Sequence, residues 1–269
     1  IEDITKLKGI LYIATSLGVY AYINNQFVAV EGINSQTWAL QKFITTNDTL
    51  LLASTEKGLF EIRKTKSKFI QAEYGFSLYQ SKFNPNRMYM GMGDGLTSLK
   101  YENKTWKYED YLNGIDYKIK HIEEDSNGNL WLATPVDGLI KVNFNSSSND
   151  TLLTAWYKKY NVQYFGTTNG LPTMNDNIPY QYNEHIVFAT NYGIYKFDKQ
   201  KQKFYQSAFL KKELFQSQVY RFAPKGNSSV WMFTVKPNQT KETGIAILQN
   251  DNSYTWYTQP FRKIADREI

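Results

Sequence analysis

The chain of 269 residues contains no cysteine and only two histidines. Without cysteine it can form no disulfide bond, no thiolate zinc site and no cysteine-based catalytic centre. With only two histidines, a histidine-based metal site or catalytic triad is hard to build. His121 is expected in a strand and His185 at a hairpin turn. The lack of cysteine fits both a reducing cytosol and a bacterial envelope, so it assigns no compartment. We predict neither a bound metal nor a cofactor.

Long apolar runs and short catalytic motifs are also missing. No stretch of about 18 uncharged apolar residues occurs, so no transmembrane helix is predicted within this sequence. A nucleophile elbow, a zinc-binding His-Glu-x-x-His helix and a phosphate-binding loop are all absent. The glycines at 91–95 lack a following helix and are interpreted as a hairpin. Any two of the 25 acidic residues could still face each other as a glycosidase pair, but none stands out, so we predict no catalytic residues.

Aromatic residues are abundant, with 6 Trp, 21 Tyr and 16 Phe, and this content favours a β-rich fold. The formal net charge is +6, which raises the question of nucleic acid as a partner. However, the basic residues are scattered, and the two densest groups, at 63–68 and 199–203, fall in expected hairpin turns. A nucleic-acid site needs a continuous basic face, so we predict no such partner.

One sequence phrase recurs six times along the chain. It consists of apolar residues, a small residue, Thr or Ser, a short turn and a glycine, and its clearest copy spans 130–138. The glycines of the copies are Gly18, Gly58, Gly95, Gly138, Gly193 and, more loosely, Gly244. They are 40, 37, 43, 55 and 51 residues apart, a period typical of propeller blades with four strands each. The short aromatic and β-branched runs between turn residues favour strands over helices.

The sequence therefore predicts an all-β fold, a β-propeller of four-stranded antiparallel blades, with about six blades as part of a longer array. The chain is interpreted as one propeller over 1–269, with blades at approximately 1–30, 31–72, 73–110, 111–160, 161–208 and 209–260. Residues 261–269 resemble the start of a further blade. In blade four, an Asn-Gly turn at 125–129 is expected to join the first two strands, and 145–150 to form an insertion. A closed ring of six blades and closure with a partner chain remain alternatives.

A propeller gathers its second-to-third strand turns and its inter-blade linkers on one face, around the central channel. Aromatic rings there can stack on the apolar faces of sugars, while Asp and Asn side chains bond hydroxyl groups. For each residue, simple loop closure or packing between blades is the alternative interpretation. The candidate ligand-binding residues on this face are Trp38, Asp94, Asp116, Tyr117, Asp137, Asn169, Asn191 and Tyr192.

The segment 125–142, with Asp-Ser-Asn-Gly-Asn-Leu-Trp-Leu-Ala-Thr followed by Gly-Leu-Ile-Lys-Val, resembles the two-component regulator propeller repeat. The linker 165–172, which carries Asn-Gly-Leu-Pro, is similar to the inter-blade segment of that family. The resemblance weakens in blades three and six, and Ala replaces the usual small Gly in four copies. It implies the periplasmic sensor region of a hybrid two-component system, whose parent protein is a membrane-anchored histidine kinase and a homodimer.

Three functions remain open on this basis. The first is a non-catalytic periplasmic sensor fragment that responds to a glycan-derived oligosaccharide and so regulates transcription of utilisation genes. In the whole protein, ligand binding would favour one domain arrangement and bias the kinase. The second is a propeller lyase or hydrolase acting on glycans, and the third is a protein-interaction scaffold. Because the chain begins with Ile1, we interpret it as a mature or excised segment in which any signal peptide has been removed.

Overall fold

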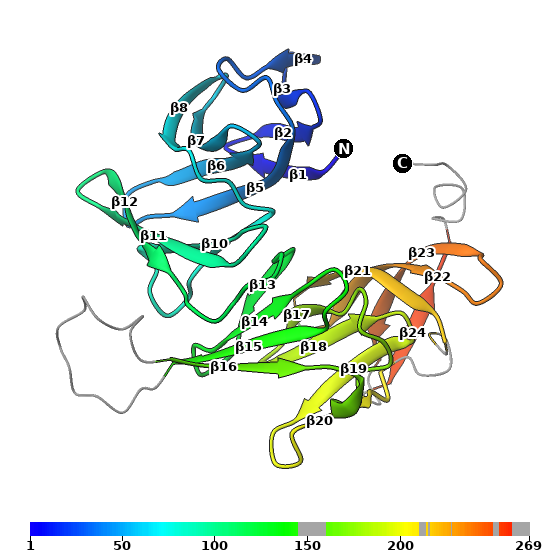
Figure 1. The fold of residues 1–269 in the computed structure, drawn as a ribbon. Coiled ribbons are helices and arrows are strands. Elements are labelled where there is room, and N and C mark those ends of the chain that lie inside the picture. Colours follow the sequence, from blue (N-terminus) through cyan, green and yellow to red (C-terminus); the bar gives the residue numbers. More distant parts are fainter. Residues whose placement is uncertain (145–159, 210–213, 215, 227, 250–252, 260–269) are drawn as a thin grey trace. The chain divides into compact units, whose positions relative to one another are not determined.

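A computed structural model describes residues 1–144, 160–209, 214, 216–226, 228–249 and 253–259. The expected insertion at 145–150 and the expected start of a further blade at 261–269 lie outside the described residues. The described part forms six four-stranded antiparallel sheets, each with its strands in sequence order, and one short 3-10 helix (Figure 1). These sheets are the blades of a β-propeller, so the predicted all-β fold class is confirmed.

The first three blades follow each other along the chain. Blade one consists of β1 (Asp3–Leu7), β2 (Ile10–Thr15), β3 (Gly18–Ile23) and β4 (Gln26–Ala29). Blade two consists of β5 (Thr37–Ile44), β6 (Thr49–Thr55), β7 (Gly58–Arg63) and β8 (Lys66–Gln71). Blade three consists of β9 (Ser77–Gln80), β10 (Arg87–Gly91), β11 (Leu96–Glu102) and β12 (Thr105–Tyr111).

The second half of the chain repeats the same plan. Blade four consists of β13 (His121–Glu124), β14 (Leu130–Ala133), β15 (Leu139–Phe144) and β16 (Tyr160–Phe165), followed by the 3-10 helix η2 (Thr167–Asn169). Blade five consists of β17 (Ile178–Tyr182), β18 (His185–Thr190), β19 (Gly193–Asp198) and β20 (Lys203–Gln206). Blade six consists of β21 (Gln218–Lys225), β22 (Ser229–Val235), β23 (Lys241–Leu248) and β24 (Tyr254–Tyr257).

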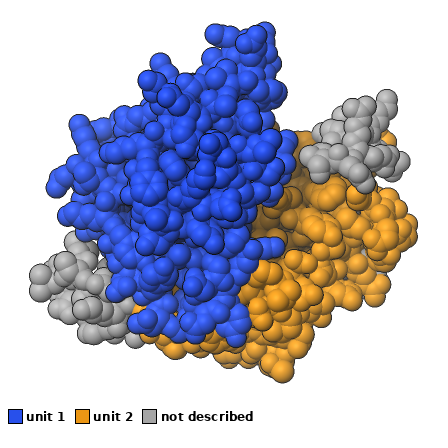
Figure 2. Space-filling view, turned by 45° about the horizontal axis from the view of Figure 1, so that its top comes forward, with its two compact units in different colours: residues 1–122 blue, residues 123–269 orange. Residues whose placement is uncertain are grey.

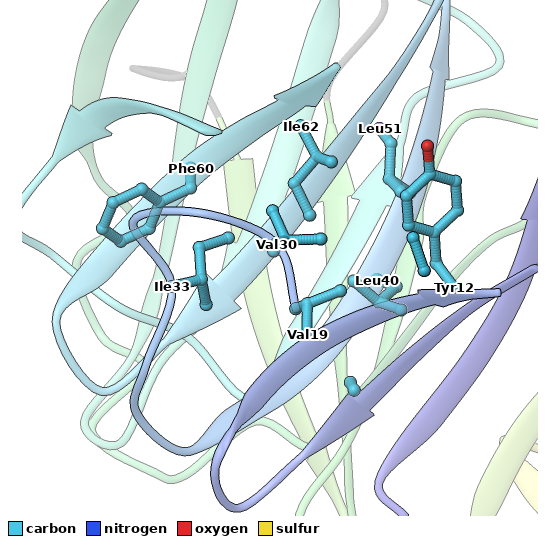
Figure 3. Packing of buried hydrophobic residues seen from close by; sticks show 11 residues of the cluster. Tyr12, Val19, Val30, Ile33, Leu40, Leu51, Phe60 and Ile62 are labelled. Carbon is cyan, nitrogen blue, oxygen red and sulfur yellow. The ribbon is translucent and has the colours of Figure 1, made fainter. Parts of the chain in front are cut away.

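The chain divides into two compact units, Ile1–Ile122 and Glu123–Ile269, which Figure 2 shows in blue and orange. In each unit, apolar side chains of neighbouring blades interlock. In unit 1, Tyr12 and Val19 of blade one pack against Leu51, Phe60 and Ile62 of blade two (Figure 3). In unit 2 the corresponding clusters join blade four to blade five and blade five to blade six. The core of each unit is therefore a series of layers between blades.

A threonine hydroxyl closes the turn between the second and third strands in four blades. It donates to the carbonyl oxygen of the turn glycine and accepts a hydrogen bond from the backbone N–H two or three residues after it. In blade two, Thr55 Oγ1 lies 3.0 Å from Gly58 O and 3.1 Å from Lys57 N. Thr15, Thr134 and Thr190 do the same. This network explains the recurring Thr and Gly of the sequence phrase.

Three local expectations need correction. In blade six, Gly244 lies inside β23 opposite Met232, whereas the hairpin turn at 236–240 contains no glycine. In blade two, Lys64 occupies the third turn, but Lys66 and Lys68 belong to β8, because the turn is only two residues long. His185, which was expected at a hairpin turn, is the first residue of β18, because the turn before it contains only residues 183 and 184. The expected turn at 125–129 is confirmed, with Asp125 N donating to Asn129 O at 2.8 Å.

Replacing Thr55 with valine should lower the free energy of unfolding by about 1–3 kcal/mol, because the methyl group leaves the Lys57 N–H and the Gly58 carbonyl without their buried partner. Thr55 is fully buried, so water cannot replace the hydroxyl. The matched control is Thr15→Val, which removes the same two bonds at a half-buried site. Urea denaturation should show the larger loss for Thr55→Val. If both variants lost the same free energy of unfolding, burial of the threonine would not determine what its hydrogen bonds contribute.

Candidate functional site

The eight candidate residues lie in the turns, linkers and strand starts where the repeat pattern places them. Four belong to unit 1: Trp38 lies in β5, Asp94 in the β10–β11 turn, and Asp116 and Tyr117 between β12 and β13. Four belong to unit 2: Asp137 lies in the β14–β15 turn, Asn169 in η2, and Asn191 and Tyr192 in the β18–β19 turn.

In unit 1, Trp38 is part of a cluster of rings that also contains Tyr74 and Phe76 from the linker between β8 and β9. The ring centroid of Trp38 is 5.3 Å from that of Tyr74, in a stacked arrangement, and 4.7 Å from that of Phe76. Lys118 Nζ lies 3.5 Å from the centroid of Phe76. We call Trp38, Tyr74, Phe76 and Lys118 the aromatic cluster. Tyr74 is exposed and Trp38 is half-buried, so the cluster reaches the protein surface.

Backbone contacts bring the linker that carries Asp116 and Tyr117 to the β10–β11 turn. Ile119 N donates to Met92 O at 2.8 Å, and Ser77 Oγ donates to Ile119 O at 3.1 Å. These bonds position Lys118 against the rings. Burial lowers the pKa of the Lys118 amine, and the charge of Lys120 lowers it further. Sequence reasoning missed Tyr74, Phe76 and Lys118, although the Tyr-Gly-Phe tripeptide in this linker was an available signal.

In unit 2, Asn169 has a structural contact that accounts for its presence. Its Oδ1 accepts a hydrogen bond from Gly166 N at 3.1 Å, which closes the loop around η2. The backbone N–H of Asp137 donates to Thr134 Oγ1 at 2.8 Å, and its side chain is exposed. Neither residue lines the hollow to which Asn191 and Tyr192 contribute.

Asn191 and Tyr192, by contrast, line a hollow of about 410 Å³ at the blade five and blade six turns. We call it the amide hollow, because side-chain amides dominate its wall. Its lining residues are Thr173, Asn191, Tyr192, Gln216, Gln218, Val235, Lys236, Pro237 and Gln239. They come from the linker before β17, from the linker before β21 and the first residue of that strand, from the β18–β19 turn, and from the end of β22 and the turn that follows it. The amide hollow therefore combines two of the predicted residues, Asn191 and Tyr192, with seven residues that were not predicted to bind a ligand.

The turns around the amide hollow are held by hydrogen bonds within the chain. Tyr192 N donates to Thr190 Oγ1 at 3.0 Å, and Gln206 Nε2 donates to Tyr192 O at 3.0 Å. In the opposite turn, Gln239 N donates to Lys236 O at 2.9 Å. These bonds fix the backbone of the turns, so less conformational freedom of the backbone is lost when a ligand binds.

Three features suit the amide hollow to a ligand rich in hydroxyl groups. Asn191 Oδ1 is buried and has no hydrogen-bond partner among the described residues, so a ligand donor could satisfy it. Gln216 and Gln239 have φ angles of 52° and 65°, the left-handed region that non-glycine residues seldom adopt. The lining contains no carboxylate, and the Lys236 amine lies 3.4 Å from Glu242. Amides and a tyrosine ring can bind sugar hydroxyls and a sugar face.

Gln216, Gln218 and Gln239 were missed by sequence reasoning. Glutamines alternate at 216 and 218, where the linker leads into β21, and this alternation was a signal for two of them. Gln239 lies in the long turn of blade six, which the sequence marked only as a departure from the repeat. Among the described residues, no group of three or more His, Asp or Glu side chains could hold a metal ion. Within that same part of the chain, no helix has the length and apolarity to cross a membrane.

Comparison with known proteins identifies one repeat in the sequence. The family model for the two component regulator propeller matches residues 113–135, which end in the second strand and following turn of blade four. No curated protein matches the chain in a sequence search.

Solved structures with the same fold are distant in sequence. The chain is similar to the extracellular domain of a protein from B. thetaiotaomicron described as a one component system, with 12% identity and a TM-score of 0.62. The alignment covers 98% of this chain and 34% of that chain, so this chain spans about a third of its neighbour. An ancestral GH74 enzyme matches with 13% identity and a TM-score of 0.58, over 96% of this chain and 38% of that one.

A third similar structure is virginiamycin B lyase from Staphylococcus aureus, with 11% identity and a TM-score of 0.57. That alignment covers 96% of this chain and 83% of the lyase. At these identities the likeness concerns the fold, which one-component systems and enzymes share, and does not transfer an activity. The chain is thus built of β-propeller blades, and its fourth blade carries a two component regulator propeller repeat.

Proposed function

We propose that this chain is a non-catalytic, extracytoplasmic sensor domain that binds an oligosaccharide in the amide hollow. The matched repeat and the fold shared with an extracellular domain of a one component system support the sensor part. In a longer receptor of the two-component type, binding would favour one arrangement of domains and so regulate transcription of utilisation genes. A periplasmic location and a dimeric parent kinase belong to the same proposal.

The observation that carries the ligand class is the composition of the amide hollow. Its wall offers several side-chain amides, the hydroxyls of Thr173 and Tyr192, the exposed Tyr192 ring and a buried acceptor at Asn191 Oδ1. A glycosidase needs two carboxylates that flank the scissile bond, and no Asp or Glu lines this hollow. The lining therefore favours binding over cleavage. The aromatic cluster of unit 1 offers further ring faces for the same ligand class.

Calorimetric titration of the chain with a panel of neutral oligosaccharides tests this proposal. For a sugar that binds, Asn191→Ala should weaken the affinity about twofold to tenfold, because one hydrogen bond contributes about 0.5–1.5 kcal/mol. Tyr192→Ala should weaken it about tenfold, as expected for the loss of a ring that covers a sugar face.

The repeat supplies matched controls for both variants. Ser16 and Leu17 occupy the same positions in the blade one turn, between Thr15 and Gly18. Ser16→Ala and Leu17→Ala should leave the affinity unchanged, since neither residue lines the amide hollow. If the blade one variants weaken binding as much as the blade five variants, or if Asn191→Ala and Tyr192→Ala bind like the wild type, the amide hollow is not the ligand site.

A further inference from the structure

A cavity with a volume of about 240 Å³ lies in unit 1, between blades one and two (Figure 1). Residues of the β1–β2, β5–β6 and β7–β8 turns contribute to its wall, so it lies at the strand ends opposite to the second-to-third strand turns of these blades. We call it the tyrosine cavity, because its wall includes a buried tyrosine. Its lining residues are Leu7, Lys8, Ile10, Tyr12, Asp48, Thr49, Leu50, Ile62, Arg63 and Lys64. None of these residues belongs to the amide hollow.

The apolar part of this wall is mainly aliphatic. Leu7 and Ile10 come from blade one, and Leu50 and Ile62 come from blade two. Tyr12 and Ile62 belong to the apolar layer between these two blades (Figure 3), and Leu7 and Ile10 pack against that layer. The cavity is smaller than the roughly 300–1,000 Å³ of a pocket for a drug-sized ligand, so it suits a small molecule rather than an oligosaccharide.

Tyr12 contributes a hydroxyl group to the tyrosine cavity. The residue is only 2% exposed, and its hydroxyl makes no hydrogen bond to another described residue. Burial raises the pKa of this hydroxyl, and neither a hydrogen bond nor a neighbouring charge contributes to the shift. The large majority of buried side-chain polar atoms in proteins have a hydrogen-bond partner. The Tyr12 hydroxyl is therefore available as a donor to a ligand in the cavity.

The charged residues that line the tyrosine cavity are mostly basic. Lys8, Arg63 and Lys64 contribute three positive charges. Asp48 contributes one negative charge, so the lining carries two net positive charges. Glu61 does not line the cavity but is paired with Arg63, and counting it leaves one net positive charge. A site with this charge favours a monoanion as its ligand.

Two of these cations, Arg63 and Lys64, have donors that can bind a ligand. The third, Lys8, is paired with Asp48, so these two charges largely compensate each other. Arg63 Nε donates to Glu61 Oε1 at 2.8 Å, which leaves its Nη groups without a bond to another described residue. Lys64 follows directly in the β7–β8 turn, and its amine forms neither a hydrogen bond nor an ion pair within the described part of the chain. Both side chains are exposed, so an anion can reach them from solvent.

The tyrosine cavity thus combines an aliphatic wall with a hydroxyl donor and an excess of positive charge. We propose that it binds a small aliphatic monocarboxylate. The carboxylate accepts hydrogen bonds from the Arg63 guanidinium, the Lys64 amine and the Tyr12 hydroxyl. The hydrocarbon chain of the ligand lies against Ile10 and Ile62. The proposal does not depend on oligosaccharide binding, because the amide hollow belongs to unit 2.

Hexanoate is the probe for this proposal, with hexanamide as the neutral molecule of the same shape. Saturation-transfer NMR and calorimetric titration of the whole chain should give a dissociation constant of about 1 mM or tighter for hexanoate and at least about tenfold weaker binding of hexanamide. From propanoate to hexanoate, each added methylene group should strengthen binding about threefold to fourfold, because the aliphatic wall removes it from water.

Two variants test the proposed donors. Lys64→Gln, an exposed change that should not affect folding, should weaken hexanoate binding about threefold to tenfold. Tyr12→Phe removes the hydroxyl group but keeps the buried ring, so the protein should fold and bind hexanoate about twofold to tenfold more weakly.

Lys66→Gln and Tyr22→Phe are the matched controls, because both residues lie in the same two blades and neither lines the cavity. Both controls should bind hexanoate like the wild type. The proposal is overturned if hexanoate does not bind, if hexanamide or propanoate binds equally well, or if Lys64→Gln or Tyr12→Phe keeps the wild-type affinity. A control that weakens binding as much as its matched variant also overturns it.

Discussion

Replacing Arg87 with methionine should lower the free energy of unfolding by about 3–5 kcal/mol, the cost of leaving a buried charge without its partner. Arg87 is only 2% exposed and donates to Glu109 through two parallel bonds, Nε to Oε2 at 2.6 Å and Nη2 to Oε1 at 2.7 Å. Ser98 Oγ donates to the same carboxylate at 2.7 Å. Without the guanidinium, Glu109 must either remain charged in an apolar layer or take up a proton.

Urea denaturation of the whole chain measures this decrease in the free energy of unfolding, and two further variants test its cause. Lys107→Met removes a mostly exposed ammonium group from its pair with the partly exposed Glu102, so it should cost less than about 1 kcal/mol. Arg87→Met combined with Glu109→Gln should recover part of the loss, because no unpaired charge then remains. Equal effects of Arg87→Met and Lys107→Met would show that burial of the pair does not determine its contribution.

The same ion pair predicts how stability depends on pH. Burial alone would raise the pKa of Glu109, but the bonds and charge of Arg87, with the bond from Ser98, hold that pKa below its ordinary value. A lowered pKa in the folded state means that this stabilisation is present above the ordinary glutamate pKa of about 4.3 and is lost as the pH falls through the lower folded-state value. Glu109→Gln should therefore reduce the loss of stability between neutral and acidic pH.

Gly58→Ala should lower the free energy of unfolding by about 3 kcal/mol or more, through backbone strain together with a steric clash. The φ angle of Gly58 is 115°, and an added Cβ would lie 2.1 Å from the carbonyl oxygen of Gln71. That oxygen belongs to the end of the fourth strand, which passes directly over the turn. The substitution forces the turn and this strand apart.

Gly9→Ala is the control that distinguishes the cost of backbone strain from the cost of a steric clash. Gly9 also has a positive φ, 85°, but no atom lies within 4 Å of an added Cβ. It should cost about 1 kcal/mol by strain alone. Thermal and urea unfolding of both variants would compare the two costs. If Gly9→Ala proves as harmful as Gly58→Ala, the close approach of the fourth strand is not what requires glycine at this turn.

The repeat phrase predicts most strands correctly because its residues have local roles. Thr55 and Gly58 define a turn by a hydrogen bond between residues of the phrase and by close packing against Gln71 of the same blade, so both effects arise within one repeat. The phrase fails in blade six because Gly244 serves another purpose. It lies within a strand where an added Cβ would be 2.6 Å from the ring of Trp256, so the glycine makes room for an aromatic residue.

The candidate site could be predicted only in part for a related reason. Asn191 and Tyr192 were found because they lie in a repeat turn, whose place in a blade the phrase fixes. Gln216 and Gln239 come from a linker and from an irregular turn, and both have left-handed backbones that no pattern in the phrase encodes. Their convergence on one hollow depends on the packing of blade five against blade six, which is a tertiary property.

The most direct test of the account is calorimetric titration of the unaltered chain with the oligosaccharide panel, followed by chromatography of the sugars in the same samples. The account predicts saturable heat with at least one oligosaccharide and recovery of that sugar unchanged, as expected of a binding domain whose hollow contains no carboxylate. Shortened or unsaturated products would contradict it in favour of an enzyme. The absence of heat with every sugar would contradict the proposed ligand class.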